Sequence, residues 1–178
     1  MKNPSIESQL FEALAFAAHK HRAQRRKDVE ASPYINHPIA LARTLAVEGG
    51  VTDTRTLIAA VLHDTVEDTD TTFEEIAAMF GAKVADIVRE VTDDTTLDKA
   101  VRKRLQIEHA PLMSRRAALV KLADKTSNLR DVASNPPRGW PIERKRAYFD
   151  WAKAVIDELP PVNKRLRAAF DEAYSKRP

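Results

Sequence analysis

The chain has 178 residues, with 29 basic and 26 acidic side chains, four glycines and no cysteine. This length predicts one domain, covering residues 1–178. The lack of cysteine excludes disulfides, thiolate metal sites and a cysteine nucleophile, and the few glycines exclude the glycine-rich loops that hold nucleotide phosphates. The net charge of +3 is too small to predict a nucleic-acid partner.

The sequence shows no sign of a membrane span or a targeting segment. A membrane span needs about 20 apolar residues, and no segment approaches that length. The apolar stretch at 10–18 is short and contains Glu12, which disfavours a signal or transit peptide. We therefore expect a cytoplasmic protein with no membrane partner.

Apolar residues recur at helical spacing almost throughout, and no run of strict alternation indicates a strand. The pattern predicts an all-α fold, a single bundle of about eight to ten helices. Helices are expected at 5–22, from Pro38 to 49, from 54 through the HDTVED segment at 63–68, from 72 to about 81, and at 82–92, 98–109, 114–133, 141–158 and 162–174.

Several residue types that favour helix starts support these boundaries. Ser5 is expected to cap the first helix, Asn36 or His37 the second, and Asp53 or Thr54 the third. Thr72 to Glu75 matches a capping box. The other histidines, His19, His21 and His109, are expected at the surface or at helix ends.

The HDTVED segment carries the strongest local signal. If the helix continues, His63, Asp64, Glu67 and Asp68 cover an arc of roughly 140°. Like charges at this spacing repel, so the arrangement is costly unless a cation is bound or the segment is an acidic helix end in solvent. The apolar residues 57–62 directly before it favour burial and therefore a cation.

A second polar stripe lies in the segment 119–129, where Lys121, Asp124, Lys125 and Asn128 share an arc of roughly 100°. Alone, it is equally consistent with an ordinary exposed face. Taken together with His63 and Asp64, it makes Asp124 a candidate third metal ligand, and His37 a fourth. Two imidazoles and two carboxylates suit Mn²⁺, Fe²⁺ or Zn²⁺ better than Ca²⁺ or a structural zinc ion.

The order H…HD…D across separate helices is the pattern of HD phosphohydrolases, and longer strings narrow the match. These strings are HRAQRRKD at 21–28, PYINHP at 33–38, VLHDTVEDT at 61–69, EVTDD at 90–94, RKRLQIE at 102–108, LVKLADK at 119–125, NLRD at 128–131 and GWPIER at 139–144. They closely resemble the small alarmone hydrolases, the stand-alone hydrolase branch of the RelA/SpoT homologues, which includes metazoan SpoT-like enzymes. The resemblance covers about residues 5–175.

The resemblance implies a helical HD domain that binds Mn²⁺ and removes the 3′-pyrophosphate of (p)ppGpp, giving GDP or GTP. Some members are also linked to removal of the 2′-phosphate of NADPH. By position, the resemblance makes His37, His63, Asp64 and Asp124 the metal ligands and Glu67 and Asp68 the catalytic carboxylates. It places Arg26 and Lys27 at the base and phosphates, Asn128 at the sugar-phosphate, and Arg144 and Tyr148 at a distal phosphate.

The expected chemistry is hydrolysis by water whose pKa a divalent ion lowers from about 15.7 towards neutrality. Glu67 would orient or deprotonate the water, and Asp68 would position it or return a proton to the leaving group. Lys121 and Lys125 add positive charge for the substrate phosphates. Two alternatives stay open at this point: an NADPH 2′-phosphatase or other nucleotide phosphohydrolase, and a non-catalytic HD module that only binds a nucleotide.

Overall fold

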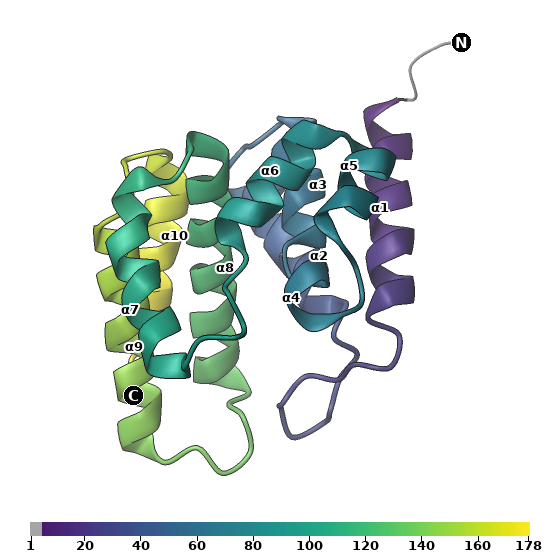
Figure 1. Ribbon diagram of the computed structural model, residues 1–178. Coiled ribbons are helices and arrows are strands. Elements are labelled where there is room, and N and C mark those ends of the chain that lie inside the picture. Colours follow the sequence, from purple (N-terminus) through teal and green to yellow (C-terminus); the bar gives the residue numbers. More distant parts are fainter. Residues whose placement is uncertain (1–4) are drawn as a thin grey trace.

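The computed structural model describes residues 5–178, which form the expected all-α fold (Figure 1). Residues 1–4 of the predicted domain lie outside the described range. The helices are α1 (Ile6–Lys20), α2 (Asn36–Arg43), α3 (Thr54–Leu62), α4 (Thr65–Asp68), α5 (Phe73–Phe80), α6 (Ala82–Val91), α7 (Lys99–His109), α8 (Arg115–Ser134), α9 (Ile142–Asp157) and α10 (Lys164–Tyr174), with a π-helical turn η1 (Thr44–Glu48) and a 3₁₀ turn η2 (Ala110–Leu112). Across residues 5–178, none of the helices has the length and apolar character to cross a membrane; the cytoplasmic location stays a prediction.

Three of the predicted helix caps are confirmed. The side chains of Ser5, Asp53 and Thr72 each accept a hydrogen bond from a backbone N–H in the first turn of their helix. The capping box at Thr72 is only half formed, because the Glu75 carboxylate accepts from the Lys20 ammonium at 3.1 Å. That ion pair connects α5 to the end of α1.

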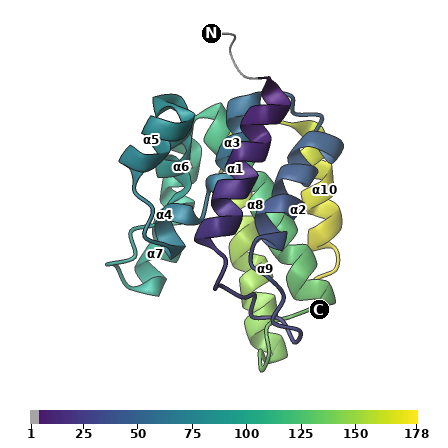
Figure 2. The same cartoon turned by 90° about the vertical axis from the view of Figure 1, so that its right-hand side faces the viewer.

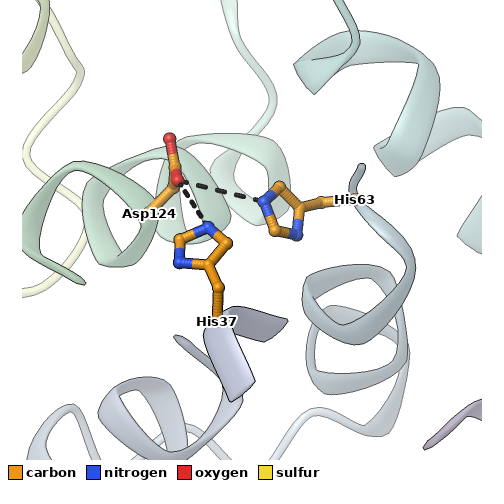
Figure 3. Close-up of side chains that lie close together, drawn as sticks. All are labelled: His37, His63 and Asp124. Atoms are coloured by element: carbon orange, nitrogen blue, oxygen red, sulfur yellow. Dashed lines mark ion pairs between the residues drawn. The ribbon is translucent and has the colours of Figure 1, made fainter. Parts of the chain in front are cut away.

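The start of α2 differs from the prediction. The helix begins before Pro38, so Asn36 and His37 lie within it, and the residue at the N-cap position, Ile35, makes no side-chain cap. The predicted capping roles of Asn36 and His37 are therefore wrong. The imidazole of His37 is instead buried and directed towards α3 and α8 (Figure 3).

The predicted continuous helix through the HDTVED segment is also wrong, because a turn at His63 and Asp64 separates α3 from α4. Two side chains there hydrogen-bond to carbonyls at the end of α3: His63 Nδ1 lies 2.9 Å from the Ala60 oxygen, and Thr65 donates to Leu62 at 2.7 Å. These bonds satisfy carbonyls that a continuing helix would bond through its backbone N–H groups. The turn therefore ends α3 with two of its last carbonyls bonded by side chains.

Helix α8 lies at the centre of the fold and packs against α2, α3, α6, α9 and α10 (Figures 1 and 2). Every residue from 117 to 127 is buried, so α8 is surrounded along this stretch. In contrast, α7 has no buried residue and packs against α9 at the edge of the molecule. Any polar residue in the buried part of α8 must find its partners inside the protein.

Candidate active site

Three helical regions bring two histidines and an aspartate together in the interior. His37 comes from α2, His63 from the turn after α3, and Asp124 from α8; their side-chain ligand atoms all lie within 4.8 Å of one another (Figure 3). His37 Nε2 lies 3.3 Å from Asp124 Oδ1, and His63 Nε2 lies 3.9 Å from the same oxygen. These three residues form a buried group that can hold a metal ion.

Asp64 stands beside this group. Its Oδ2 atom lies 2.9 Å from His63 Nε2 and 3.9 Å from His37 Nε2. The hydroxyl of Tyr34 donates a short hydrogen bond to the same oxygen. Asp64 therefore lies against both histidines of the group, although the three mutually close ligand atoms belong to His37, His63 and Asp124.

The orientation of the imidazoles fits metal ligation. His63 Nδ1 faces the Ala60 carbonyl, so the neutral ring carries its proton there and presents an unprotonated Nε2 to the group. Within residues 5–178, that buried Nε2 has no hydrogen-bond partner. Asp64 Oδ2 lies 2.9 Å from this nitrogen, and a metal ion held by both groups would take the place of a proton on it.

Outer contacts hold the Asp124 carboxylate. Asn128 donates to Oδ1 at 2.6 Å, and the Lys125 ammonium donates to Oδ2 at 3.1 Å. Burial alone would raise the pKa of Asp124, but Lys125 and the two imidazoles hold it well below its ordinary value. Such hydrogen-bonded outer partners are typical of carboxylates that ligate metals.

The charges in this group attract a cation. Burial opposes the imidazolium form of His63, but the carboxylates of Asp64 and Asp124 raise the pKa of the ring to about 9. Burial likewise opposes the ionised form of Asp64, and His63 nevertheless keeps its pKa below the ordinary value. The two carboxylates therefore require positive charge beside them, which a divalent ion would supply.

Glu67 and Asp68 of α4 lie next to the candidate metal group, and each has its own partners. The Glu67 carboxylate accepts from the Asp93 backbone N–H at 3.2 Å and lies 3.4 Å from the Arg102 guanidinium. Burial raises the pKa of Glu67 to about 6. Asp68 is exposed and accepts from the Gln24 amide at 2.8 Å.

A cavity of about 520 Å³ opens beside the candidate ligand His37. Of the predicted substrate-binding residues, its lining includes Arg26, Lys27, Asn128 and Tyr148, together with Asp68. The volume lies within the usual range for small-molecule sites. The structure thus brings these predicted residues to one cavity, and their roles stay predictions.

Arg144 lies in a neighbouring cavity of about 280 Å³, where its guanidinium stacks 4.4 Å from the centre of the Trp140 ring. Tyr148 lines both cavities and so stands between them. Burial raises the pKa of the Tyr148 hydroxyl to about 12. The hydroxyl is therefore a hydrogen-bond donor at neutral pH.

Lys121 and Lys125 do not line the larger cavity. The buried Lys121 ammonium donates to the Val91 carbonyl at 3.0 Å, and Lys125 pairs with Asp124 while lying 4.5 Å from the Trp151 ring centre. Burial lowers the pKa of Lys121. Both lysines thus have partners within the protein in this conformation.

Other residues of the site did not stand out in the sequence. Gln24 and Tyr34 contact the two aspartates of the HDTVED segment, and Asp131 of α8 forms a short ion pair with Arg26. Each lies inside a string that marks the family resemblance, at 21–28, 33–38 and 128–131. The strings therefore indicate that these residues belong to the site. They do not predict the contacts, which join residues 30 to 105 positions apart in the chain.

Fold and site together define a class of protein: an all-α domain with a buried His/Asp group that can hold a metal ion, beside a cavity with positive side chains. The family model for the HD domain matches residues 13–147. The chain therefore belongs to the HD domain family.

Close relatives cover nearly the whole chain. Guanosine-3′,5′-bis(diphosphate) 3′-pyrophosphohydrolase MESH1 of Xenopus tropicalis is 56% identical over 165 residues, which is 93% of this chain and 92% of the relative. The Homo sapiens protein of the same name is 55% identical over 173 residues and 97% of both chains. A solved structure of a metazoan ortholog of SpoT has a TM-score of 0.93 at 50% identity, covering 99% of this chain and 98% of that one. The predicted resemblance is confirmed.

Proposed function

We propose that this protein is a metal-dependent hydrolase that removes the 3′-pyrophosphate of (p)ppGpp, giving GDP or GTP and pyrophosphate. The supporting observation is that three of the proposed metal ligands lie close together, next to a cavity lined by His37 and Asp68. The chain also matches relatives named for this reaction along almost its full length. The metazoan ortholog of SpoT is described as hydrolysing ppGpp and having a role in starvation responses.

We propose Mn²⁺ as the ion, held by His37, His63, Asp64 and Asp124. Two imidazole nitrogens and two carboxylate oxygens form a mixed donor set that suits Mn²⁺, with Fe²⁺ and Zn²⁺ as alternatives. When bound, the ion would polarise the phosphoryl group and supply an activated water at neutral pH. Metal analysis of the purified protein by mass spectrometry identifies the ion.

Glu67 and Asp68 would move the protons. A carboxyl with a pKa of about 6 both accepts and releases a proton near neutral pH, so Glu67 is suited to orient or deprotonate the attacking water. Asp68 lines the cavity and would position the water or protonate the 3′ oxygen that leaves. The bond from this oxygen to phosphorus breaks, and the proton keeps the ribose hydroxyl neutral.

Positive and polar groups around the cavity would hold the substrate. Arg26 and Lys27 lie where a base and phosphates could be bound, and Asn128 lies next to Asp124. Arg144 and Tyr148 line the neighbouring cavity of about 280 Å³, and a further phosphate would bind there. Lys121 and Lys125 would act through their charge, since both are buried and already paired.

The test is an assay of purified protein with added Mn²⁺ on ppGpp and NADPH, measuring pyrophosphate and orthophosphate separately. We expect pyrophosphate and GDP from ppGpp, and loss of the reaction when a chelator removes the metal. Orthophosphate release from NADPH alone would show a 2′-phosphatase instead. Binding of ppGpp without turnover would show a non-catalytic module.

A further inference from the structure

Asp68 is held by a chain of hydrogen bonds that begins outside the cavity. Gln24, in the turn after α1, donates its amide N–H to Asp68 Oδ2 at 2.8 Å. Its amide oxygen lies 2.6 Å from His21 Nδ1. His21 is the C-cap residue of α1 and is 2% exposed, so it lies at a helix end as expected but is not at the surface.

The chemistry of the three groups fixes the direction of these bonds. An ionised carboxylate only accepts, so the Gln24 amide must turn its NH₂ group towards Asp68. Its carbonyl oxygen then faces His21, which must carry its proton on Nδ1. The other ring nitrogen, Nε2, is buried and has no hydrogen-bond partner in the described part of the chain. A proton there would be a buried donor without an acceptor, so the Nδ1–H tautomer is favoured over the Nε2–H tautomer.

A ring contact and two backbone hydrogen bonds support this chain of bonds. The His21 ring lies against the Tyr34 ring, with centroids 4.8 Å apart. The Gln24 backbone N–H donates to the His21 carbonyl at 2.9 Å, and its carbonyl accepts from the Tyr34 N–H at 3.2 Å. Tyr34 in turn donates to Asp64. The backbone bond between Gln24 and Tyr34 therefore joins the two residues whose side chains donate to Asp68 and Asp64.

We propose that Gln24, oriented by His21, is a positioning residue for the Asp68 carboxylate. A neutral amide fixes one carboxylate oxygen without neutralising the charge, unlike the Arg102 guanidinium beside Glu67. Asp68 is thus held in a defined orientation at the rim of the cavity. The inference rests on the proposed function, because it concerns the part that Asp68 plays in turnover.

The test compares single and double variants in the ppGpp assay. Gln24→Met keeps the length of the side chain but removes both hydrogen bonds, and we expect kcat to fall about 10- to 100-fold, because small misplacements of reacting groups have effects of this size. His21→Phe keeps the ring against Tyr34, and we expect a fall of about 5-fold with KM unchanged, since His21 does not line the cavity. His19→Phe, at an exposed position of the same helix, is the matched control and should retain full activity.

The double variant separates positioning from a general loss of stability. Because His21 acts through Gln24, the double variant His21→Phe with Gln24→Met should have the same kcat as Gln24→Met alone. His21→Asn, whose amide places a donor near the position of Nδ1, should recover part of the loss. The inference would be overturned if the two single substitutions lowered kcat by factors that multiply in the double variant. It would also be overturned if activity fell only to the extent that the melting temperature fell.

A second measurement is independent of metal and substrate. Nitrogen-15 NMR of the metal-free protein should show His21 protonated at Nδ1 and not at Nε2, and this preference should disappear in Gln24→Met. Protonation at Nε2 would overturn the inference. Failure of the wild-type protein to hydrolyse ppGpp would instead overturn the proposed function, and with it the catalytic part of the inference.

Discussion

Glu67 and Asp68 are neighbours in the chain, yet their surroundings differ in a way that matters for proton transfer. Glu67 is partly buried between a backbone N–H and a guanidinium, whereas Asp68 is exposed and held by a neutral amide. The pKa of Glu67 is raised to about 6 by burial. Two carboxylates in different environments can take different parts in one reaction.

Removal of either carboxylate should therefore impair turnover while the metal stays bound. We expect Glu67→Gln and Asp68→Asn each to lower kcat on ppGpp by about 10² to 10⁴, the usual contribution of a general acid or base. Metal content by mass spectrometry should match that of the wild type. Glu74→Gln, at an exposed carboxylate of α5, is the control. Wild-type turnover in both variants would remove Glu67 and Asp68 from the mechanism.

At the scale of single elements, the start of α3 depends on Asp53. Its carboxylate caps the helix by accepting from the Thr56 N–H at 3.0 Å, and Arg116 of α8 donates to it at 2.9 Å. The hydrogen bond from Arg116 is the main reason that the pKa of Asp53 lies below its ordinary value. Asp53 thus links α3 to α8. His63 follows the end of α3, and Asp124 lies in α8.

Asp53→Ala should lower the unfolding free energy by about 1 kcal/mol near pH 7, the usual cost of losing a cap. Because the pKa of Asp53 is lower in the folded protein, its contribution is full above the unfolded pKa of about 3.9 and is lost as the pH falls through the folded pKa. The difference between wild type and variant should therefore shrink below about pH 4. Urea titrations at pH 7 and pH 3.5 measure it. A difference that grows in acid would contradict this assignment.

The π-helical turn after α2 brings the backbone of Gly49 against α10. A Cβ atom at Gly49 would lie 2.7 Å from the Leu45 carbonyl oxygen and 2.8 Å from the Leu166 side chain. We expect Gly49→Ala to lower the unfolding free energy by about 1 to 3 kcal/mol, as overpacking typically does. Thermal and urea unfolding measure the loss. Unchanged stability would show that α10 moves aside without cost.

The sequence predicted those parts of the elements that depend on local chemistry. Ser5, Asp53 and Thr72 were identified as caps because a cap needs only its own first turn. The break at His63 and Asp64 does not follow from the sequence, because a helical pattern continues through it and does not show that His63 and Thr65 bond back to carbonyls of α3. The order of the motifs is enough to choose His37, His63 and Asp124, which the structure places close together, but the contact of Gln24 with Asp68, 44 residues away, could not be predicted.

At the scale of the whole molecule, the candidate metal site joins parts of the chain that are far apart in sequence. Its ligands come from α2, the turn between α3 and α4, and α8, the central helix against which both α2 and α3 pack. The unfolded chain does not bring these residues together. A metal ion should therefore bind the folded state almost exclusively, and its binding energy should add to the stability of the entire fold.

Addition of Mn²⁺ should raise the melting temperature of the metal-free protein. At a free concentration 100 times the Kd, binding to the folded state alone adds about 2.7 kcal/mol, which for a chain of this size corresponds to about 5 to 10 °C. Scanning calorimetry at increasing Mn²⁺ measures the shift. Asp124→Asn, which removes a charged ligand from α8 but keeps its shape, should show almost no shift. An equal shift in this variant would mean that the stabilising ion binds elsewhere, since the predicted site depends on the charge of Asp124.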